Sequence, residues 1–218
     1  MDLPIWRTTS GMEQTKQKMK INFVTEPWEH IIIDDFLSPE RFEHIQNLAI
    51  EELGRFQVEG LNTFRGDRYN RYTDVDLLPE VTLDIMKLMP HRDYDKLVKV
   101  NHWSIMPPNT SYPAHIDNRS RIHTFTFYVA PEKNLGTILC DNPSNNDDGD
   151  HGQPDQPTIC EYPIEWKPNR AFVHNARPKQ WHRFVSGDTH RINLSVFFMD
   201  VDKINSNRHD ILSNLIPV

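Results

Sequence analysis

The feature that most constrains this chain is an alternation of residue types with a period of two, which begins near residue 97 and persists to residue 201. Within residues 121–130, for example, Phe125 and Phe127 alternate with Thr124 and Thr126. Successive side chains of a β-strand point to opposite faces, so this pattern predicts a series of short strands. The predicted strands are residues 97–106, 121–130, 136–140, 158–164, 170–174, 180–185 and 190–201.

The front half of the chain has helical signals instead. A short strand is predicted at residues 30–37, and Ser38 followed by Pro39 is typical of a helix start. Apolar residues then recur at helical spacing until Gly54, where we expect the helix to end. A second helix is predicted over residues 79–89. Helices followed by many strands predict a mostly β fold, a jelly roll with helices packed outside it.

We expect one folded domain over residues 26–218, preceded by an N-terminal arm at residues 1–25, because 218 residues suffice for a single core. The helical support would span about residues 38–90 and the jelly-roll core about residues 96–201. A formal charge of −7 argues against nucleic acid or an anionic membrane as a partner, since both attract basic surfaces. Neither a signal peptide nor a long apolar run is evident, so we expect a soluble cytoplasmic protein.

The chain has two cysteines, Cys140 and Cys160. A hairpin whose loop is residues 141–159 could bring them together. Cytosolic thiols are normally reduced, so we expect both to be free. Residues 141–156 are rich in Asn, Asp, Gly and Pro, which predicts a flexible surface loop.

A candidate metal site begins with His115 and Asp117. Two residues apart on an extended segment, their side chains point the same way and can reach one ion. A second match to the same pattern, His91 and Asp93, follows a predicted helix end in a highly charged stretch. We favour the first pair because it lies between two predicted strands, where the mouth of a barrel would be.

His174, His182 and His190 are candidates for a third ligand. We favour His182, because its strand and the strand headed by Arg191 form a predicted hairpin that would bring both residues to one cavity. Two histidines and one carboxylate leave positions open on a divalent metal, as in non-haem iron oxygenases. A buried Arg191 needs an anionic partner, either a carboxylate of the protein or that of a ligand.

These residues carry a family resemblance. The chain resembles the Fe(II)- and 2-oxoglutarate-dependent dioxygenases, particularly their prolyl-hydroxylase-like branch, over roughly residues 28–200. The matching positions are the segment from Ile33 to Ser38, His115, Asp117, the segment from Pro168 to Phe172, Trp181, His182, Gly187, Arg191 and Ser195.

The resemblance implies a double-stranded β-helix, a cupin-like jelly roll. In it, His115, Asp117 and His182 would hold Fe(II), and Arg191 would bind the far carboxylate of the co-substrate 2-oxoglutarate. The reaction expected with O2 is hydroxylation of a C–H bond in a peptide side chain or a small amino-acid-like substrate, with release of succinate and CO2.

Four further residues are expected to contact 2-oxoglutarate. Asn193 stands where relatives often have Ser or Thr two residues after the arginine, and Ser195 follows on the same strand face. Tyr128 and Asn101 lie on strands expected to face the cavity, although ordinary filling of the barrel is an equal alternative for both.

Two other functions remain open. One is a cupin-like metalloenzyme that does not use 2-oxoglutarate, which we expect to have a further ligand near His115. The other is a non-catalytic jelly-roll binding or structural protein in which the histidines never meet.

Overall fold

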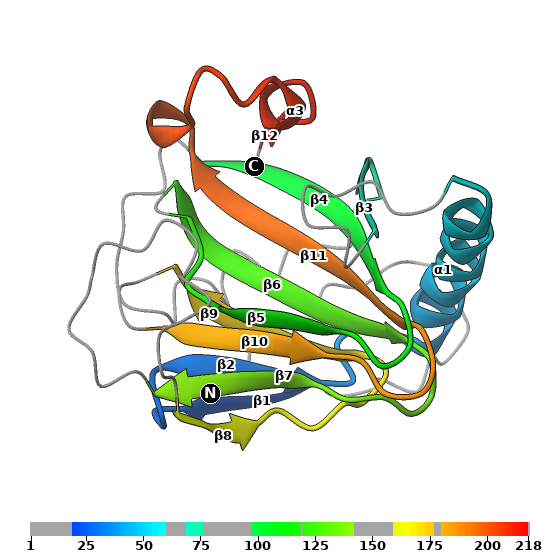
Figure 1. Cartoon of the computed structure of the whole chain (residues 1–218). Helices are drawn as coiled ribbons and strands as arrows, with labels where there is room; N and C mark the ends of the chain where they lie inside the picture. Colours follow the sequence, from blue (N-terminus) through cyan, green and yellow to red (C-terminus); the bar gives the residue numbers. More distant parts are fainter. Residues whose placement is uncertain are drawn as a thin grey trace, which may run out of the picture.

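The computed structural model describes residues 19–59, 69–75, 97–118, 120–141, 159–176 and 180–217. Two antiparallel sheets face each other, and one long helix lies beside the larger sheet (Figure 1). The predicted helix at 79–89, nearly all of the predicted loop at 141–156 and residues 1–18 of the predicted arm lie outside the described residues.

The larger sheet contains eight strands. Their order is β1 (Lys20–Val24), β2 (His30–Asp34), β9 (Arg170–Asn175), β6 (Arg121–Ala130), β11 (Arg191–Asp200), β4 (Leu97–Met106) and β12 (Ile216–Pro217), with β3 (Tyr69–Thr73) also paired with β4. The four-stranded sheet has the order β5 (Ser111–His115), β10 (Trp181–Val185), β7 (Thr137–Asp141) and β8 (Ile159–Pro163). The prediction of a mostly β jelly-roll core with flanking helix is confirmed. Strand β1 was not predicted; it lies within the expected arm and pairs with β2.

Helix α1 (Pro39–Glu59) covers the outer face of the larger sheet. Its predicted end at Gly54 is wrong, because the helix continues for five more residues. A glycine inside a helix costs about 1 kcal/mol relative to alanine. Packing of the following turn offsets this cost, since the ring of Phe56 lies 5.7 Å from that of Tyr69.

The two faces of the larger sheet differ in chemistry. Its outer face is apolar and packs with α1, using residues such as Phe125 on β6 and Leu194 on β11. Its inner face, turned towards the small sheet, carries buried polar residues at the alternate positions. These include Thr124, Thr126, Arg191, Asn193 and Ser195. A sheet face that only filled a core would be apolar, so this polar interior is where a site is to be sought.

Asn101 lies on the opposite face from the one expected. It pairs in register with Val196, whose side chain belongs to the outer apolar cluster, and its Nδ2 donates to the Val75 carbonyl at 3.0 Å. Strand β4 is buried on both faces, so alternation of polarity could not reveal which face is the inner one.

The C-terminal segment follows β11 with a short 3-10 helix, η1 (Val201–Lys203), and a single-turn helix, α3 (His209–Leu212). Among the helices of the described ranges, none has the length and apolar character needed to cross a bilayer.

Cys140 and Cys160 form a disulfide, contrary to the expectation that both are free. They are register partners on β7 and β8, so the predicted hairpin brings them together. Cys140 also packs with Ile116 and Trp181, which adjoin the candidate metal ligands in sequence. The disulfide therefore fastens the strands behind the site.

Reducing this disulfide should lower stability. The two half-cystines are 20 residues apart. A disulfide that closes a loop of this size stabilises the folded protein by about 3 kcal/mol, because it restricts the unfolded chain. We expect Tm to fall by roughly 5–10 °C on reduction. Thermal melts with and without reductant measure this, and a Cys160→Ser variant should melt at one temperature in both conditions. A wild-type melt indifferent to reductant would contradict the prediction.

Candidate metal centre

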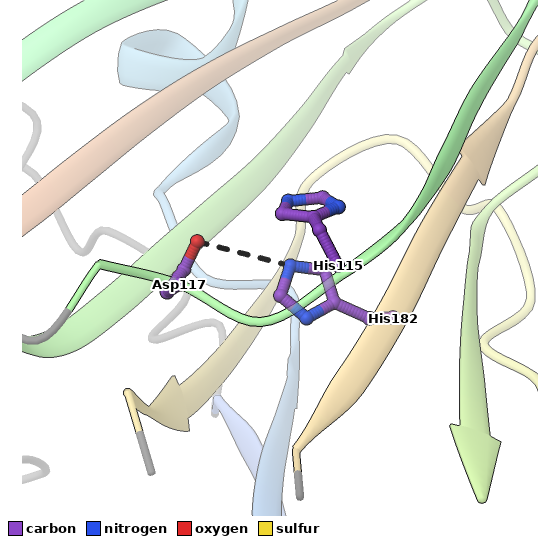
Figure 2. Close-up of side chains that lie close together, drawn as sticks. All are labelled: His115, Asp117 and His182. Carbon is purple, nitrogen blue, oxygen red and sulfur yellow. Dashed lines mark ion pairs between the residues drawn. The ribbon is translucent and has the colours of Figure 1, made fainter. Parts of the chain in front are cut away.

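Three of the predicted site residues meet at one end of the interior. His115 ends β5 and is the register partner of His182 on β10, with ring centres 4.4 Å apart. Asp117 follows two residues later, in the loop that leads to β6. One donor atom from each residue lies within 4.8 Å of the other two, and all three side chains are buried (Figure 2). The alternative in which the histidines never meet is therefore wrong.

Backbone carbonyls set the orientation of both imidazoles. Nδ1 of His115 lies 3.0 Å from the Pro113 carbonyl oxygen, and Nδ1 of His182 lies 3.1 Å from that of Gln180. A carbonyl can only accept, so each Nδ1 carries the proton in these hydrogen bonds. In the neutral rings, Nε2 then keeps its lone pair. This is the state that a metal ligand requires, and such hydrogen bonds are typical of metal-binding histidines.

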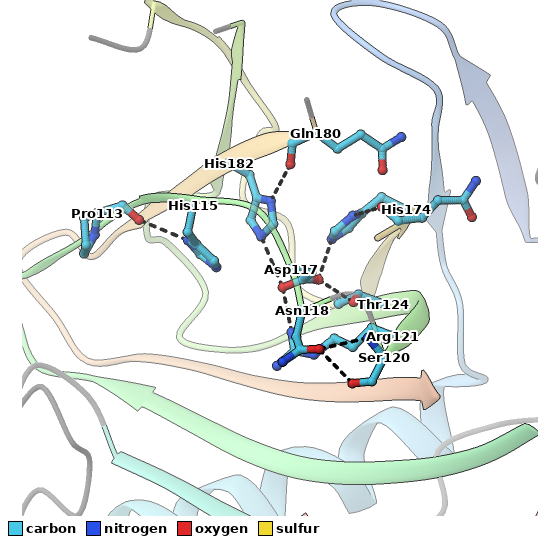
Figure 3. A network of polar contacts seen from close by, with 11 residues as sticks. Pro113, His115, Asp117, Asn118, Ser120, Arg121, Thr124, His174, Gln180 and His182 are labelled. Carbon is cyan, nitrogen blue, oxygen red and sulfur yellow. Dashed lines mark hydrogen bonds and ion pairs between the residues drawn. The ribbon is translucent and has the colours of Figure 1, made fainter. Parts of the chain in front are cut away.

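Asp117 is held by two donors that the sequence did not suggest. Arg121 donates from Nη1 to Oδ1 and Thr124 from Oγ1 to Oδ2, both at 2.6 Å (Figure 3). Burial raises the pKa of Asp117, but the Arg121 guanidinium, joined by the neighbouring imidazoles when they are protonated, outweighs it and holds the pKa well below its ordinary value. The carboxyl group is therefore ionised at neutral pH and fixed in orientation.

His174, a rejected candidate for the third ligand, lies beside the cluster. Its Nε2 is 3.6 Å from Oδ2 of Asp117, and its ring centre is 4.8 Å from that of His182. The set of three mutually close donors does not include it. Burial is the main cause that lowers the pKa of His174 to about 3, so the ring is neutral at neutral pH.

This buried neutral histidine should make the metal-free protein less stable in acid. Its folded pKa is about 3 and its ordinary value is 6.5, so below pH 6.5 the unfolded chain binds a proton that the folded chain does not. As the pH is lowered from 6.5 to about 3, the free energy of unfolding should decrease. This group contributes up to about 1.4 kcal/mol per pH unit to that decrease. Urea unfolding at several pH values measures this dependence. The free energy of unfolding should change less steeply with pH in His174→Phe than in the wild type, and equal slopes would contradict the assignment of His174 as a buried neutral histidine.

Arg191 lies on the inner face of the larger sheet and is buried, with 1% of its surface exposed. Its Nε donates to the Leu135 carbonyl at 3.2 Å and its Nη2 to Oγ1 of Thr137 at 3.4 Å. Its Cζ is 5.2 Å from the ring centre of Phe184 and 5.5 Å from that of Tyr128. The guanidinium is thus fixed among aromatic rings inside the barrel.

The structure brings three of the four expected 2-oxoglutarate contacts to this face. Asn193 and Ser195 follow Arg191 at alternate positions of β11, and Tyr128 is the register partner of Asn193. Oδ1 of Asn193 is buried and has no hydrogen-bond partner among the residues that the structure describes. The Tyr128 hydroxyl donates to Oγ1 of Thr137 and accepts from the Thr137 backbone N–H, both at 2.9 Å.

No family model matches the chain, and no curated protein is similar enough in sequence to match it. Solved structures match it in fold. One is a prolyl hydroxylase from Trichoplax adhaerens in complex with a peptide fragment of the hypoxia-inducible factor oxygen degradation domain. It has a TM-score of 0.53 and 15% identity, covering 79% of this chain and 84% of that chain. Another is the non-haem α-ketoglutarate-dependent epimerase SnoN from nogalamycin biosynthesis. It has a TM-score of 0.50 and 12% identity, covering 78% of this chain and 76% of that chain. The chain shares the double-stranded β-helix fold of these two enzymes.

Several residues that contact Asp117 or Arg191 were not predicted from the sequence. Thr124 was identifiable in part, since it shares its strand face with Thr126 and Tyr128. Arg121 and Thr137 gave no signal, because a charged residue at a strand start and a threonine within a strand are both ordinary. Their roles depend on which strands meet across the interior.

Proposed function

We propose that the protein is an Fe(II)- and 2-oxoglutarate-dependent oxygenase that hydroxylates a C–H bond of a peptide side chain or a small amino-acid-like substrate. Iron held by His115, Asp117 and His182, together with 2-oxoglutarate and O2, would supply the oxidising power for this reaction, with release of succinate and CO2. The protein's own residues bind and orient the reactants and keep water out.

One observation carries this proposal. The ring of Phe184 is close to both groups: its centre is 5.5 Å from the ring of His115 and 5.2 Å from Cζ of Arg191. A candidate metal site on the small sheet and a buried cation on the larger sheet therefore both border this ring. A dicarboxylate can bind the metal with one end and the guanidinium with the other.

The residues fit both groups. Two imidazoles that present Nε2 lone pairs and one ionised carboxylate form the donor set of a non-haem iron site. Arg191 offers a planar fork suited to a carboxylate. The buried Oδ1 of Asn193 finds no hydrogen-bond partner in the described ranges, and an unpaired atom of this kind is costly in a dry core. A polar ligand in this interior would remove that cost.

The choice of hydroxylation on a peptide or amino-acid-like substrate rests on the fold. The prolyl hydroxylase of Trichoplax adhaerens was solved with a peptide fragment. The epimerase with the same fold catalyses a different reaction. The mass of the product therefore discriminates between hydroxylation and epimerisation. Hydroxylation adds one oxygen atom to the substrate and epimerisation adds none.

A cupin-like metalloenzyme that does not use 2-oxoglutarate is the second candidate. It is favoured by the position of His174, whose Nε2 is 3.6 Å from the Asp117 carboxylate. Four-ligand metal binding through this histidine would leave fewer open positions. Under this alternative, His174→Ala should weaken metal binding as strongly as His182→Ala.

The test is an anaerobic titration with Fe(II) and 2-oxoglutarate, followed by the metal-to-ligand charge-transfer absorption of the chelated co-substrate. We expect a band with the wild type, and succinate production on admission of air. Metal binding without a band would favour the second candidate. Absence of both metal binding and a band would overturn the proposal.

A further inference from the structure

Arg121 is fixed at the boundary between the buried metal centre and solvent. Its Nη1 donates to Oδ1 of Asp117 at 2.6 Å, and its Cζ lies 3.4 Å from the ring centre of Phe197. The Arg121 side chain is 21% exposed, against 3% for Asp117. An ion pair on one side and an aromatic ring on its face thus hold the guanidinium in one plane, next to a metal ligand and within reach of solvent.

Within the described part of the chain, the Arg121 guanidinium uses few of its donors. A guanidinium has five N–H donors, and the bond to Asp117 is the one hydrogen bond recorded for Arg121 among the described residues. An immobilised guanidinium with an open N–H edge suits a planar or tetrahedral oxyanion, because two parallel bonds can form without further loss of side-chain freedom.

The surroundings add positive charge. A groove of about 390 Å³ lies beside the loop that carries Asp117, lined by Asn118 and Ser120 from that loop and by Lys203 and Arg208 from the C-terminal segment. Among the described residues that line it, the two charged ones are both cations, although the chain as a whole has a net charge of −7. Lys203 also pairs with Asp200 at 2.7 Å, so the charge is partly offset at one side of the groove.

This basic region is distinct from the cation proposed for 2-oxoglutarate. Arg121 pairs in register with Met199, near the far end of β11 from Arg191. Eight residues of strand separate these two positions, which corresponds to about 26 Å along the strand. Two separate cationic positions therefore exist in one interior, and a single dicarboxylate needs only one of them.

We propose that the substrate carries an oxyanion, a carboxylate or a phosphate, which binds between Arg121 and the basic groove beside the metal centre. This inference rests on the proposed oxygenase function, because it assigns the substrate class of that same site. Arg121 binds the anion directly and holds Asp117 at the same time, so the substrate docks against a residue that orients a metal ligand.

Three blocked tripeptides that differ only at the central residue test the substrate class. The central residues are glutamate, glutamine and phosphoserine, and binding to the protein with Fe(II) and 2-oxoglutarate is measured by anaerobic calorimetry. We expect at least one anionic peptide to bind tenfold or more tightly than the glutamine peptide. The tighter of the two anionic peptides identifies the carboxylate or the phosphate as the natural group.

Charge variants locate the binding position. The double variant Lys203→Gln, Arg208→Gln should lose most of the anionic preference while leaving Fe(II) affinity unchanged. Lys133→Gln, an exposed charge beyond the opposite end of β6, is the matched control and should change nothing. Arg121→Lys keeps a counter-charge for Asp117 but loses the planar fork, so it should also reduce the preference.

Two results would overturn the inference: equal binding of the three peptides by the wild type, or an anionic preference that survives in the double variant. The charge-transfer band separates this failure from failure of the function. A band with no anionic preference leaves the oxygenase standing and removes the substrate class, whereas anionic binding without a band removes the oxygenase.

Discussion

Replacing His182 by alanine is expected to weaken Fe(II) binding by more than about a hundredfold and to abolish the charge-transfer band. Loss of an outer hydrogen-bonding partner of a metal ligand typically costs 10–100-fold in metal affinity, and removal of a ligand itself should exceed that range. His182 is 1% exposed and its Nδ1 is engaged with the Gln180 carbonyl, so its Nε2 is already aimed at the cluster. Anaerobic titration of Fe(II) measures the change.

Two histidine variants serve as controls for this result. His190→Ala removes a ring that packs on Phe56, away from the cluster, and should leave Fe(II) affinity unchanged. His174→Ala removes a neighbour of Asp117 that lies outside the set of three donors, so its effect should stay within the 10–100-fold range. If His174→Ala abolished binding and His182→Ala did not, the assignment of the third ligand would be wrong.

Replacing Arg191 by alanine is expected to raise the dissociation constant for 2-oxoglutarate by roughly thirtyfold or more. Truncating one partner of a buried, hydrogen-bonded charge pair costs about 2–5 kcal/mol, and each 1.4 kcal/mol is a factor of ten. Arg191 is 1% exposed and is fixed by the Leu135 carbonyl and the Thr137 hydroxyl. The measurement is a titration of the Fe(II)-loaded protein with 2-oxoglutarate.

Arg191→Lys should give an intermediate loss, because it keeps the charge and loses the planar fork. Arg183→Ala is the matched control. Arg183 follows His182 on β10, so its side chain points to the other side of the small sheet, and affinity for 2-oxoglutarate should not change. Normal binding by Arg191→Ala would remove Arg191 from the site.

His115 and Asp117 could be found from their spacing, but the residues that contact the Asp117 carboxylate could not. His115 and Asp117 are two residues apart, so a local rule relates them. Arg121, Thr124 and His174 reach the same carboxylate from β6 and β9. His174 meets the carboxylate only because β9 pairs with β6, which no local pattern specifies. Arg121 and Thr124 are four and seven residues from Asp117, and their contacts depend on the conformation of the turn that leads into β6, which strand periodicity does not specify.

Asn101 and Gly54 illustrate two other limits. Period-two alternation tells which residues of β4 share a face, but this strand is buried on both faces, so the polar Asn101 did not mark the interior. Gly54 is a helix-ending signal by propensity, yet α1 runs through it because the next turn finds packing partners. For Gly54, tertiary contacts outweighed a local preference of about 1 kcal/mol; for Asn101, only the strand pairing decided the face.

By itself, the sequence determined most of the strands, the jelly-roll class and the pairing of His115 with Asp117, because strand periodicity and two-residue spacing act over a few neighbouring residues. Four short strands, β1, β3, β5 and β12, were not predicted. Tertiary structure alone decided the rest. It joined Cys140 to Cys160, brought His182 into register with His115, and placed His174 beside the Asp117 carboxylate. These outcomes depend on strand order and register across two sheets, and such long-range geometry is set by the packing of the whole domain.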